Sequence, residues 1–562
     1  MKPLIKGSRR RNVFIAIAAF LITAVIVLGF FTNRFVEPIL RDRLHTLIIQ
    51  GSDSLYRYNL GNLNANFFGG SVEVENLQIE IDSSRYQQLA AQNALPALTL
   101  QLNLVRGRIR GLGVVPLLFG RRISIDEIYS KDADVVLLRH VRPDHAPENT
   151  QPLWKAIQPV IKSIAIEKIN LDGVKLLYKN ADTSHSVKLQ FDRCVALFND
   201  VKIDSAAAAD TARIAFAKNL NMQFYDLKFR TPDSSYKLKA EVISYSSTTK
   251  VFEVKDFKIQ PTLKEKEAFY QAVKRQESMY VFTFEKARFT NLHLDRFFHR
   301  NILLADTLFI DKPELDVYID RTQPPLVESK IGAYPHQRLL KANATIRLNG
   351  MVVNGAKVAY TERGEKSREE GTITFNDLHL RAANITNDSN RIKENNKCIL
   401  TATGKIFNSS PIAVNLQFYL DSVNGRFDAA GTVGPVSAAQ LNTISVPLAN
   451  TTLQSFNMQH LGFAVQGSDF EAVSNVQMRY SNLFVILKKQ DDETGAISTK
   501  KFLTKILNKF TLHPSNPGED GVERRAVGVK RARITSQAFF GLLWKSIFSG
   551  MQGVMMKSGR FD

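Results

Sequence analysis

Cysteine is nearly absent from this chain of 562 residues, which contains only Cys194 and Cys398. Two cysteines are too few for a disulfide framework or for a zinc site made of cysteine ligands, although one bridge between them stays open. The usual catalytic motifs are missing as well, because the sequence has no GxSxG, HExxH, P-loop or GxGxxG pattern. We therefore expect a protein that is not an enzyme and that needs no cofactor and no metal.

The one group of metal-ligand residue types consists of His140, Asp144, His145 and Glu148. These residues lie in a proline-bearing stretch with irregular spacing, which is typical of a solvated loop rather than of a metal site. The alternative is a hydrolase that uses this loop. Such an enzyme would lose its activity on His145→Ala alone.

Charge is missing from Val13 to Phe31, and nineteen uncharged residues are about the length of helix that crosses a bilayer. The flank before this run is basic and has no acidic residue, which favours a cytoplasmic N-terminus. A cleaved signal peptide is the alternative, but large residues follow the run where small ones would mark a cleavage site. We expect a basic cytoplasmic tail over 1–12, a transmembrane anchor over 13–31 and a juxtamembrane helix over 32–62.

Positive charge is concentrated at the two ends of the chain. Of the net charge of +20, residues 1–11 supply +5, and residues 488–562 supply 14 basic minus 7 acidic residues, or +7. Basic ends beside apolar stretches favour an anionic lipid surface as partner and argue against nucleic acid, which would need a basic stripe on a compact domain.

The segment 491–562 is expected to be helical, basic and amphipathic. Lysines recur every four residues over 501–509. A second apolar stripe in Ser536–Met556 places along one side Phe540, Leu543, Ile547, Met551 and Val554. Two interpretations stay open for this segment, namely contact with a membrane and closure of one end of a sheet. The candidate membrane-surface residues are Lys501, Lys505, Lys509, Phe540, Trp544 and Lys545.

Long helical patterns are scarce between residues 63 and 490, where short β-rich runs dominate. Short helices are expected at Ser83–Asn93 and at Glu265–Gln276, and the proline-rich or polar spans 142–152 and 321–337 are expected to be loops. A parallel sheet with crossover helices is therefore disfavoured. The sequence predicts a mainly β fold, in which an elongated, curved antiparallel sheet forms a groove.

The β-rich runs share one spacing, with apolar residues at offsets 0, 2, 5, 7, 10, 12 and 14, which we call the template. Two segments, 164–178 and 346–360, fill every place. Each three-residue step would turn the apolar face over unless a β-bulge absorbs one residue. The alternative is a tight hairpin at Asp172-Gly173 and at Asn354-Gly355. Both alternatives give a sheet with one apolar face.

Four features follow one another between residues 70 and 138. They are the strand Gly70-Ser-Val72-Glu-Val74, the alternating leucines of 98–104, the turn Pro116-Leu-Leu-Phe-Gly120 and the strand pair after it. These segments resemble the AsmA-like family, whose members have an inner-membrane anchor. The C-terminal stretches 501–510 and 539–550 resemble the ends of large AsmA-like proteins from Bacteroidetes-type bacteria. The family is related to chorein-type bridge proteins, whose β-sheet grooves carry phospholipids between membranes.

The resemblance implies a single-pass protein of the bacterial inner membrane whose large domain lies in the periplasm and carries or shields phospholipid acyl chains. Its membrane partners would be the inner membrane and the outer membrane. A regulatory or assembly factor for outer-membrane proteins is the alternative. The expected groove residues are Ile123, Ile125, Ile128, Ile164, Ile166, Ile169, Leu171, Phe282, Phe284, Phe289, Ile346, Leu348 and Val353. An inward charge, such as Leu171→Asp or Val353→Asp, is expected to block lipid carriage.

Overall fold

The computed structural model describes residues 48–49, 52–66, 70–92, 94–96, 98–112, 122–140, 162–181, 187–214, 216–231, 233–490 and 497–557. The expected tail, the expected anchor over 13–31 and most of the expected juxtamembrane helix over 32–62 lie outside these residues. The described end of that last segment is not helical, because Tyr56–Leu60 forms a strand that pairs with Leu77–Ile81. Within the described residues, no helix has the length and the apolar character needed to span a bilayer.

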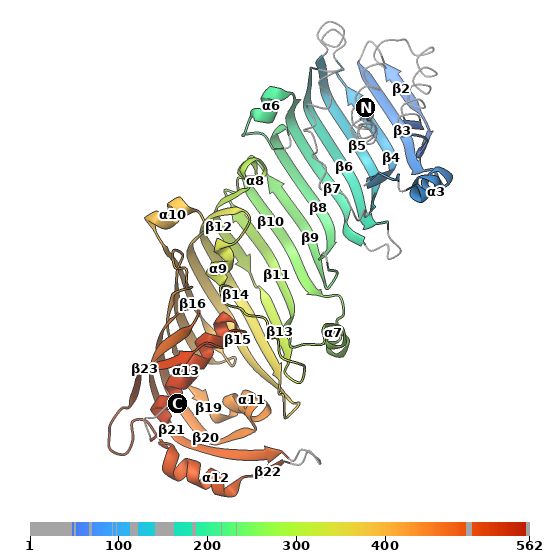
Figure 1. Cartoon of the computed structure of the whole chain (residues 1–562). Coiled ribbons are helices and arrows are strands. Elements are labelled where there is room, and N and C mark those ends of the chain that lie inside the picture. Colours follow the sequence, from blue (N-terminus) through green and yellow to red (C-terminus); the bar gives the residue numbers. More distant parts are fainter. Residues whose placement is uncertain are drawn as a thin grey trace, which may run out of the picture. The chain divides into compact units, whose positions relative to one another are not determined.

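The chain forms two compact units, which are described separately. Unit 1 comprises residues 1–255 and 293–300, and unit 2 comprises residues 256–292 and 301–562. The boundary falls inside one strand, β10. Figure 1 labels the elements of both units, which are mainly β, as expected.

Unit 1 is a sheet of long strands with short helices at its margins (Figure 1). Its elements are β1 (Tyr56–Leu60), β2 (Leu63–Asn66), β3 (Ser71–Ile81), α3 (Ser83–Ala91), β4 (Leu98–Arg110), β5 (Arg122–Arg139), β6 (Ser163–Asn180), β7 (Val187–Ile203), α6 (Ser205–Ala209), β8 (Ala217–Arg230), β9 (Tyr236–Ser246), the first part of β10 (Val251–Pro261) and α8 (Leu294–Arg300).

Unit 2 is a curved sheet that carries more helices. Its elements are α7 (Lys266–Val273), β11 (Met279–Thr290), β12 (Ile302–Asp311), β13 (Glu314–Asp320), α9 (Pro335–Leu340), β14 (Thr345–Arg363), β15 (Glu370–Thr386), α10 (Ser389–Glu394), β16 (Lys397–Ile406), β17 (Ser410–Tyr419), β18 (Phe427–Val433), β19 (Val436–Ser437), α11 (Ala438–Ala449), β20 (Thr451–Gly467), β21 (Glu471–Gln490), β22 (Ile497–Thr499), α12 (Lys501–Ile506), the π-helical turn η2 (Leu507–Thr511), β23 (Arg525–Ala532) and α13 (Phe539–Met555).

The expected short helices are confirmed by α3 and α7. Asp82 caps α3 by accepting a hydrogen bond from the Arg85 N–H at 2.8 Å. The expected loop over 321–337 is largely confirmed, since β13 ends at Asp320 and α9 begins only at Pro335.

Most neighbouring strands are antiparallel, but two joints are parallel, which the sequence did not predict. β5 pairs in parallel with β6, and β14 pairs in parallel with both β12 and β13. A parallel joint needs a long return connection. The chain has residues 140–162 before β6 and residues 321–344 before β14. The expected loop over 142–152 lies outside the described residues.

The hairpin alternative is wrong, because β6 and β14 each run unbroken through the glycine that would have formed the turn. Their pairing shows register shifts at those places, between Asp172 and Val174 and between Val353 and Ala356. Gly173 and Gly355 have φ of 78° and 64°, values that a glycine adopts without steric cost. The three-residue step at these glycines is therefore a β-bulge.

The core of unit 2 fills the inner side of the curved sheet near the C-terminus. Phe427, Val465 and Met478 are buried there together with Leu542 and Val554 of α13. A buried ion pair holds this region together, because the Arg533 Nη1 and the Asp469 Oδ1 lie 2.5 Å apart. Arg533 Nη2 also donates to the Lys330 carbonyl at 2.6 Å, so the connection before β14 is tied to the C-terminal segment.

Candidate functional site

Left-handed residues set which side chains reach the apolar face of each sheet. In strand after strand a residue with positive φ stands directly before an apolar residue that returns to this face. Such pairs are Asn76-Leu77, Asp132-Ala133, Gly173-Val174, Asp200-Val201, Asp226-Leu227, Asp256-Phe257, Gly355-Ala356, Asp377-Leu378 and Asn482-Leu483. Asn, Asp and Gly tolerate this conformation best, so the bulges are encoded locally.

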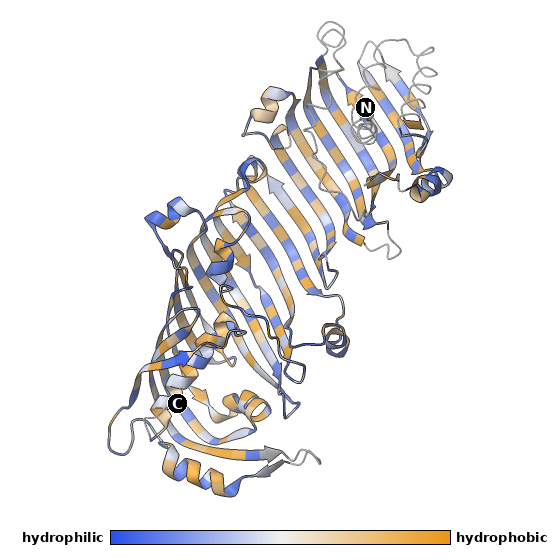
Figure 2. Cartoon of the chain, viewed as in Figure 1, coloured by the Kyte–Doolittle hydropathy of each residue, from blue (hydrophilic) through white to orange (hydrophobic). Residues whose placement is uncertain are grey.

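In unit 1 the strand register places apolar residues of β5, β6, β7 and β8 next to one another on one face of the sheet. We call this surface the floor. Ile166 of β6 lies opposite Ile125 of β5 and Val201 of β7. Farther along β7, Ala196 lies opposite Met222 of β8. Figure 2 shows the resulting alternation of apolar and polar bands along the strands.

One end of the unit 1 floor is a closed core. Ile123, Ile125, Ile164 and Ile166 are only 1 to 4% exposed and form one cluster with Val201 and its neighbours. Ile128 and Ile169 are partly buried against this cluster. The first four residues therefore form ordinary core, which corrects their expected place in an open groove.

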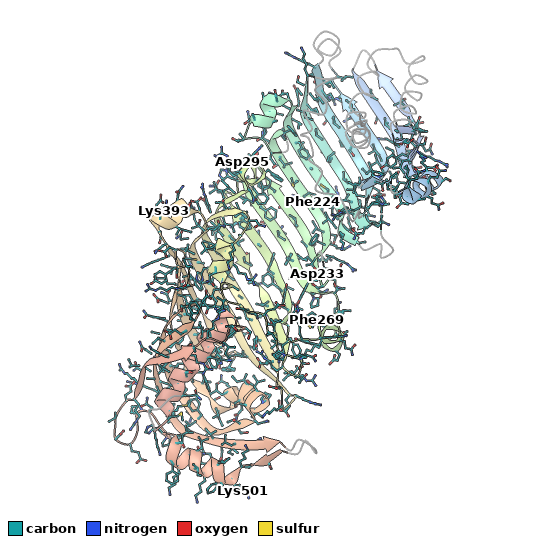
Figure 3. The ribbon with its side chains drawn as sticks, in the orientation of Figure 1. Phe224, Asp233, Phe269, Asp295, Lys393 and Lys501 are labelled. Atoms are coloured by element: carbon teal, nitrogen blue, oxygen red, sulfur yellow. The ribbon has the colours of Figure 1, made fainter. Side chains whose placement is uncertain are left out.

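The middle of the unit 1 floor is only half-covered. Leu171, Met222 and Phe224 are half-buried side chains around the buried Phe191 and Ala196. The ring centroids of Phe191 and Phe224 lie 5.1 Å apart in an edge-on arrangement. Phe224 is labelled in Figure 3 on the middle of the sheet. This stretch keeps apolar surface in reach of solvent.

Unit 2 has an apolar sheet face of its own, the unit 2 floor, which carries aromatic residues on β11 and aliphatic residues on β14. Phe282 and Phe284 are half-buried, and Phe284 stacks on Phe257 at 4.8 Å. Phe289 and Ile346 are also half-buried, whereas Leu348 and Val353 are buried beside Ala305 and Ile310 of β12. Val353→Asp is therefore expected to destabilise unit 2 itself, so it does not isolate a groove.

The C-terminal helices divide the six candidate membrane-surface residues between two places. Lys501, Lys505 and Lys509 are exposed on α12 and η2, beside the exposed Phe502 and Phe510. Figure 3 labels Lys501 at the start of α12. The inner side of this helix is fixed by Asn508, whose Nδ2 donates to the Val485 carbonyl at 2.7 Å. Basic and aromatic groups therefore share the solvent side, as interfacial helices require.

The other three residues, Phe540, Trp544 and Lys545, lie on the outer side of α13. The inner side of α13, with Leu543, Ile547, Met551 and Val554, is buried against β21 and β23 (Figure 1). The sequence stripe placed Phe540 with these buried residues, but Phe540 is 67% exposed. The helix thus closes part of the sheet and still presents an aromatic outer face.

The two cysteines are packed in the interior, and His140 lies within hydrogen-bond distance of Thr99. Cys194 and Cys398 are free and buried, and burial raises the pKa of each thiol to about 11, so both stay protonated. His140 Nε2 is 3.1 Å from the Thr99 Oγ1, whereas Asp144, His145 and Glu148 lie outside the described residues. In the part of the chain that the structure describes, no cluster could hold a metal ion.

The apolar spacing of β7 and β8 does not fit the full template, and the strands β12 and β13 were not recognised from it. The bulge of β8 lies at Asp226, so its apolar spacing differs from the template. A search for Asp, Asn or Gly directly before an apolar residue that restarts the alternation would have found β7 and β8. The segment of β12 and β13 does follow the template, from Leu303 to Val317, with Pro313 at offset 10.

Comparisons with family profiles and with curated proteins found no match. The resemblance to AsmA-like proteins therefore rests on the residues quoted above.

Proposed function

We propose that this protein is anchored by residues 13–31 in the bacterial inner membrane and carries or shields phospholipid acyl chains on their way between inner and outer membrane. The observation that supports the proposal is that each unit has a half-buried apolar floor, around Leu171 and Phe224 in unit 1 and around Phe282 and Phe284 in unit 2. A sheet face that only forms a core is normally covered by a second layer. Here a lipid chain would complete the cover.

The energetics favour a mobile cargo. Moving an acyl chain from water to an apolar surface is worth about 0.8 kcal/mol for each buried methylene, so a lipid on the floor loses little relative to the bilayer. Phenylalanine, leucine and isoleucine repeat along the floor, so neighbouring positions hold a chain about equally well. Head groups would stay in water at the open side.

The remaining features fit a carrier without catalytic chemistry. The expected N-terminal orientation places the β units in the periplasm, and the exposed lysines of α12 and η2 suit an anionic bilayer surface. Both thiols are buried and protonated. In this proposal the protein acts by binding.

The test is the lipid content of the purified full-length protein. We expect at least one phospholipid per chain after detergent extraction and size-exclusion chromatography, measured by mass spectrometry of the organic extract. A membrane protein of similar size with a closed core, purified in the same detergent, gives the background. A stable protein partner in place of lipid would reject carriage and favour the alternative role in outer-membrane protein assembly.

A further inference from the structure

The outer face of α13 carries an aromatic line. Phe540, Trp544 and Phe548 recur every four residues, so they lie one above the other on the helix, and they are 67, 45 and 42% exposed. The rings of Trp544 and Phe548 stack with centroids 6.1 Å apart. The opposite face is buried in the unit 2 core, so the helix cannot turn this line inward without breaking that core.

Positive charge gathers beside the aromatic line. Lys545, also on the outer face, interacts electrostatically with Arg531 of β23 and with Arg321 and Glu362, which lie at the ends of β13 and β14. Glu362 is already paired, because Arg321 Nε lies 3.0 Å from its Oε1. Within the described residues neither Lys545 nor Arg531 forms an ion pair, and Arg531 has only the Ser549 hydroxyl at 3.5 Å.

The β14 end of the unit 2 floor lies near Glu362, which interacts electrostatically with Lys545. Tyr360 is the last template residue of β14, and its hydroxyl donates to Glu362 Oε2 at 2.7 Å. Glu362 therefore connects the end of the floor with Arg321 and, through the charge interactions above, with Lys545. Groups from β14 and from α13 thus lie within electrostatic range of each other.

Within the described residues, neither Lys545 nor Arg531 has a carboxylate in ion-pair contact, although Glu362 lies within electrostatic range of Lys545. Burial is the first cause that lowers the pKa of Lys545, and the neighbouring Arg531 and Arg321 lower it further. Two unpaired cations and a line of exposed aromatic rings complement a phosphate joined to acyl chains.

We propose that the outer face of α13 binds one anionic phospholipid at the end of the unit 2 floor. Its phosphate pairs with Lys545 and Arg531, and its acyl chains lie along Phe540, Trp544 and Phe548. The inference rests on the proposed function and adds to it a specific residence site with a preference for anionic head groups.

The chain contains two tryptophans, so Trp154→Phe leaves Trp544 as the only indole. The probe is a short-chain phosphatidylglycerol with brominated acyl chains, added as monomers to the full-length protein in detergent. Bromine quenches indole fluorescence only on contact, so we expect saturable loss of more than half of the emission. Lys545→Glu should weaken the binding about tenfold, or about 1.4 kcal/mol. The matched control Lys393→Glu, an exposed lysine on α10, should leave it unchanged.

Three outcomes would overturn the inference. Absence of quenching while phospholipid still co-purifies would remove this site and leave the proposed function standing. Quenching by brominated vesicles but not by monomers would make the face a bilayer contact. A change of Trp544 emission that follows protein concentration without lipid would make it a contact between two copies of the chain. Loss of all co-purifying lipid in the wild-type protein would instead reject the proposed function.

Discussion

Ile164 and Leu171 allow a matched test of the floor, because they lie on the same face of the same strand, β6, under different cover. Ile164 is enclosed by Ile123, Ile166 and Ile203, whereas Leu171 is half-buried. Asp at either position introduces the same charge into the same strand. The comparison therefore separates a closed core from an open floor.

The expected costs differ several-fold. Ile164→Asp loses about 3 kcal/mol of buried side chain and adds a few kcal/mol for an unpaired buried carboxylate. The sum is comparable with the whole stability of a typical domain, about 5–15 kcal/mol, so unit 1 should unfold or lose more than about 10 °C in Tm. Leu171→Asp leaves its carboxylate in reach of water and should cost about 1–2 kcal/mol, or roughly 2–8 °C.

The assay combines differential scanning calorimetry with the lipid content of the purified variants. Leu171→Asp should remain folded and carry several-fold less phospholipid than the wild type. Asn170→Asp, which places the same charge on the opposite face of β6, is the control and should keep its lipid. Unfolding of Leu171→Asp to the same extent as Ile164→Asp would show that the floor is core throughout. A folded Leu171→Asp variant with full lipid content would remove the floor from the proposed function.

Two further predictions concern the fold. His336 is buried, neither ring nitrogen has a hydrogen-bond partner among the described residues, and burial lowers its pKa to about 4. As the pH falls, His336 therefore binds a proton in the unfolded chain at a higher pH than in the folded chain. The free energy of unfolding should fall as the pH drops from about 6.5 towards 4. His336→Leu should remove about 2 kcal/mol of the loss between pH 7 and pH 5 in urea titrations, and an unchanged pH profile would refute this role. Asp377 has φ of 51°, so Asp377→Val should cost about 1–2 kcal/mol, whereas Asp377→Gly should be tolerated. Equal melting temperatures for the two variants would contradict a left-handed bulge.

Local features of the fold were predictable because they depend on neighbouring residues. The template predicted strands with one apolar face and left a bulge and a hairpin open at Gly173 and Gly355, where the structure has bulges. The direction of pairing was not predictable, since a period of two is the same in parallel and antiparallel strands. The parallel pairing of β5 with β6 is visible only in the structure, from the register of the two strands.

The candidate site was predicted in outline but not in depth. Ile164 and Leu171 occupy equivalent kinds of template position, yet one is core and the other is half-buried. Cover depends on groups from distant segments, which the template does not contain. The faces of α13 were misread for a related reason. Phe540 stands three residues before Leu543 and four before Trp544, so spacing alone assigns it to either side of the helix.

The parallel joints indicate how this architecture could change in length. β5 with β6 and β12–β13 with β14 are two versions of one pattern, because each pair joins two template segments and carries left-handed residues side by side, Asp132 with Gly173 and Lys312 with Gly355. Both connections, 140–162 and 321–344, are of nearly equal length. Such a correspondence is what duplication of an ancestral block would leave. Each added strand widens a sheet by about 4.8 Å and leaves the register on either side intact. The number of strands could therefore increase by duplication of such a block. The connecting segments can then acquire separate roles, as 321–344 does where the Lys330 carbonyl accepts a hydrogen bond from Arg533.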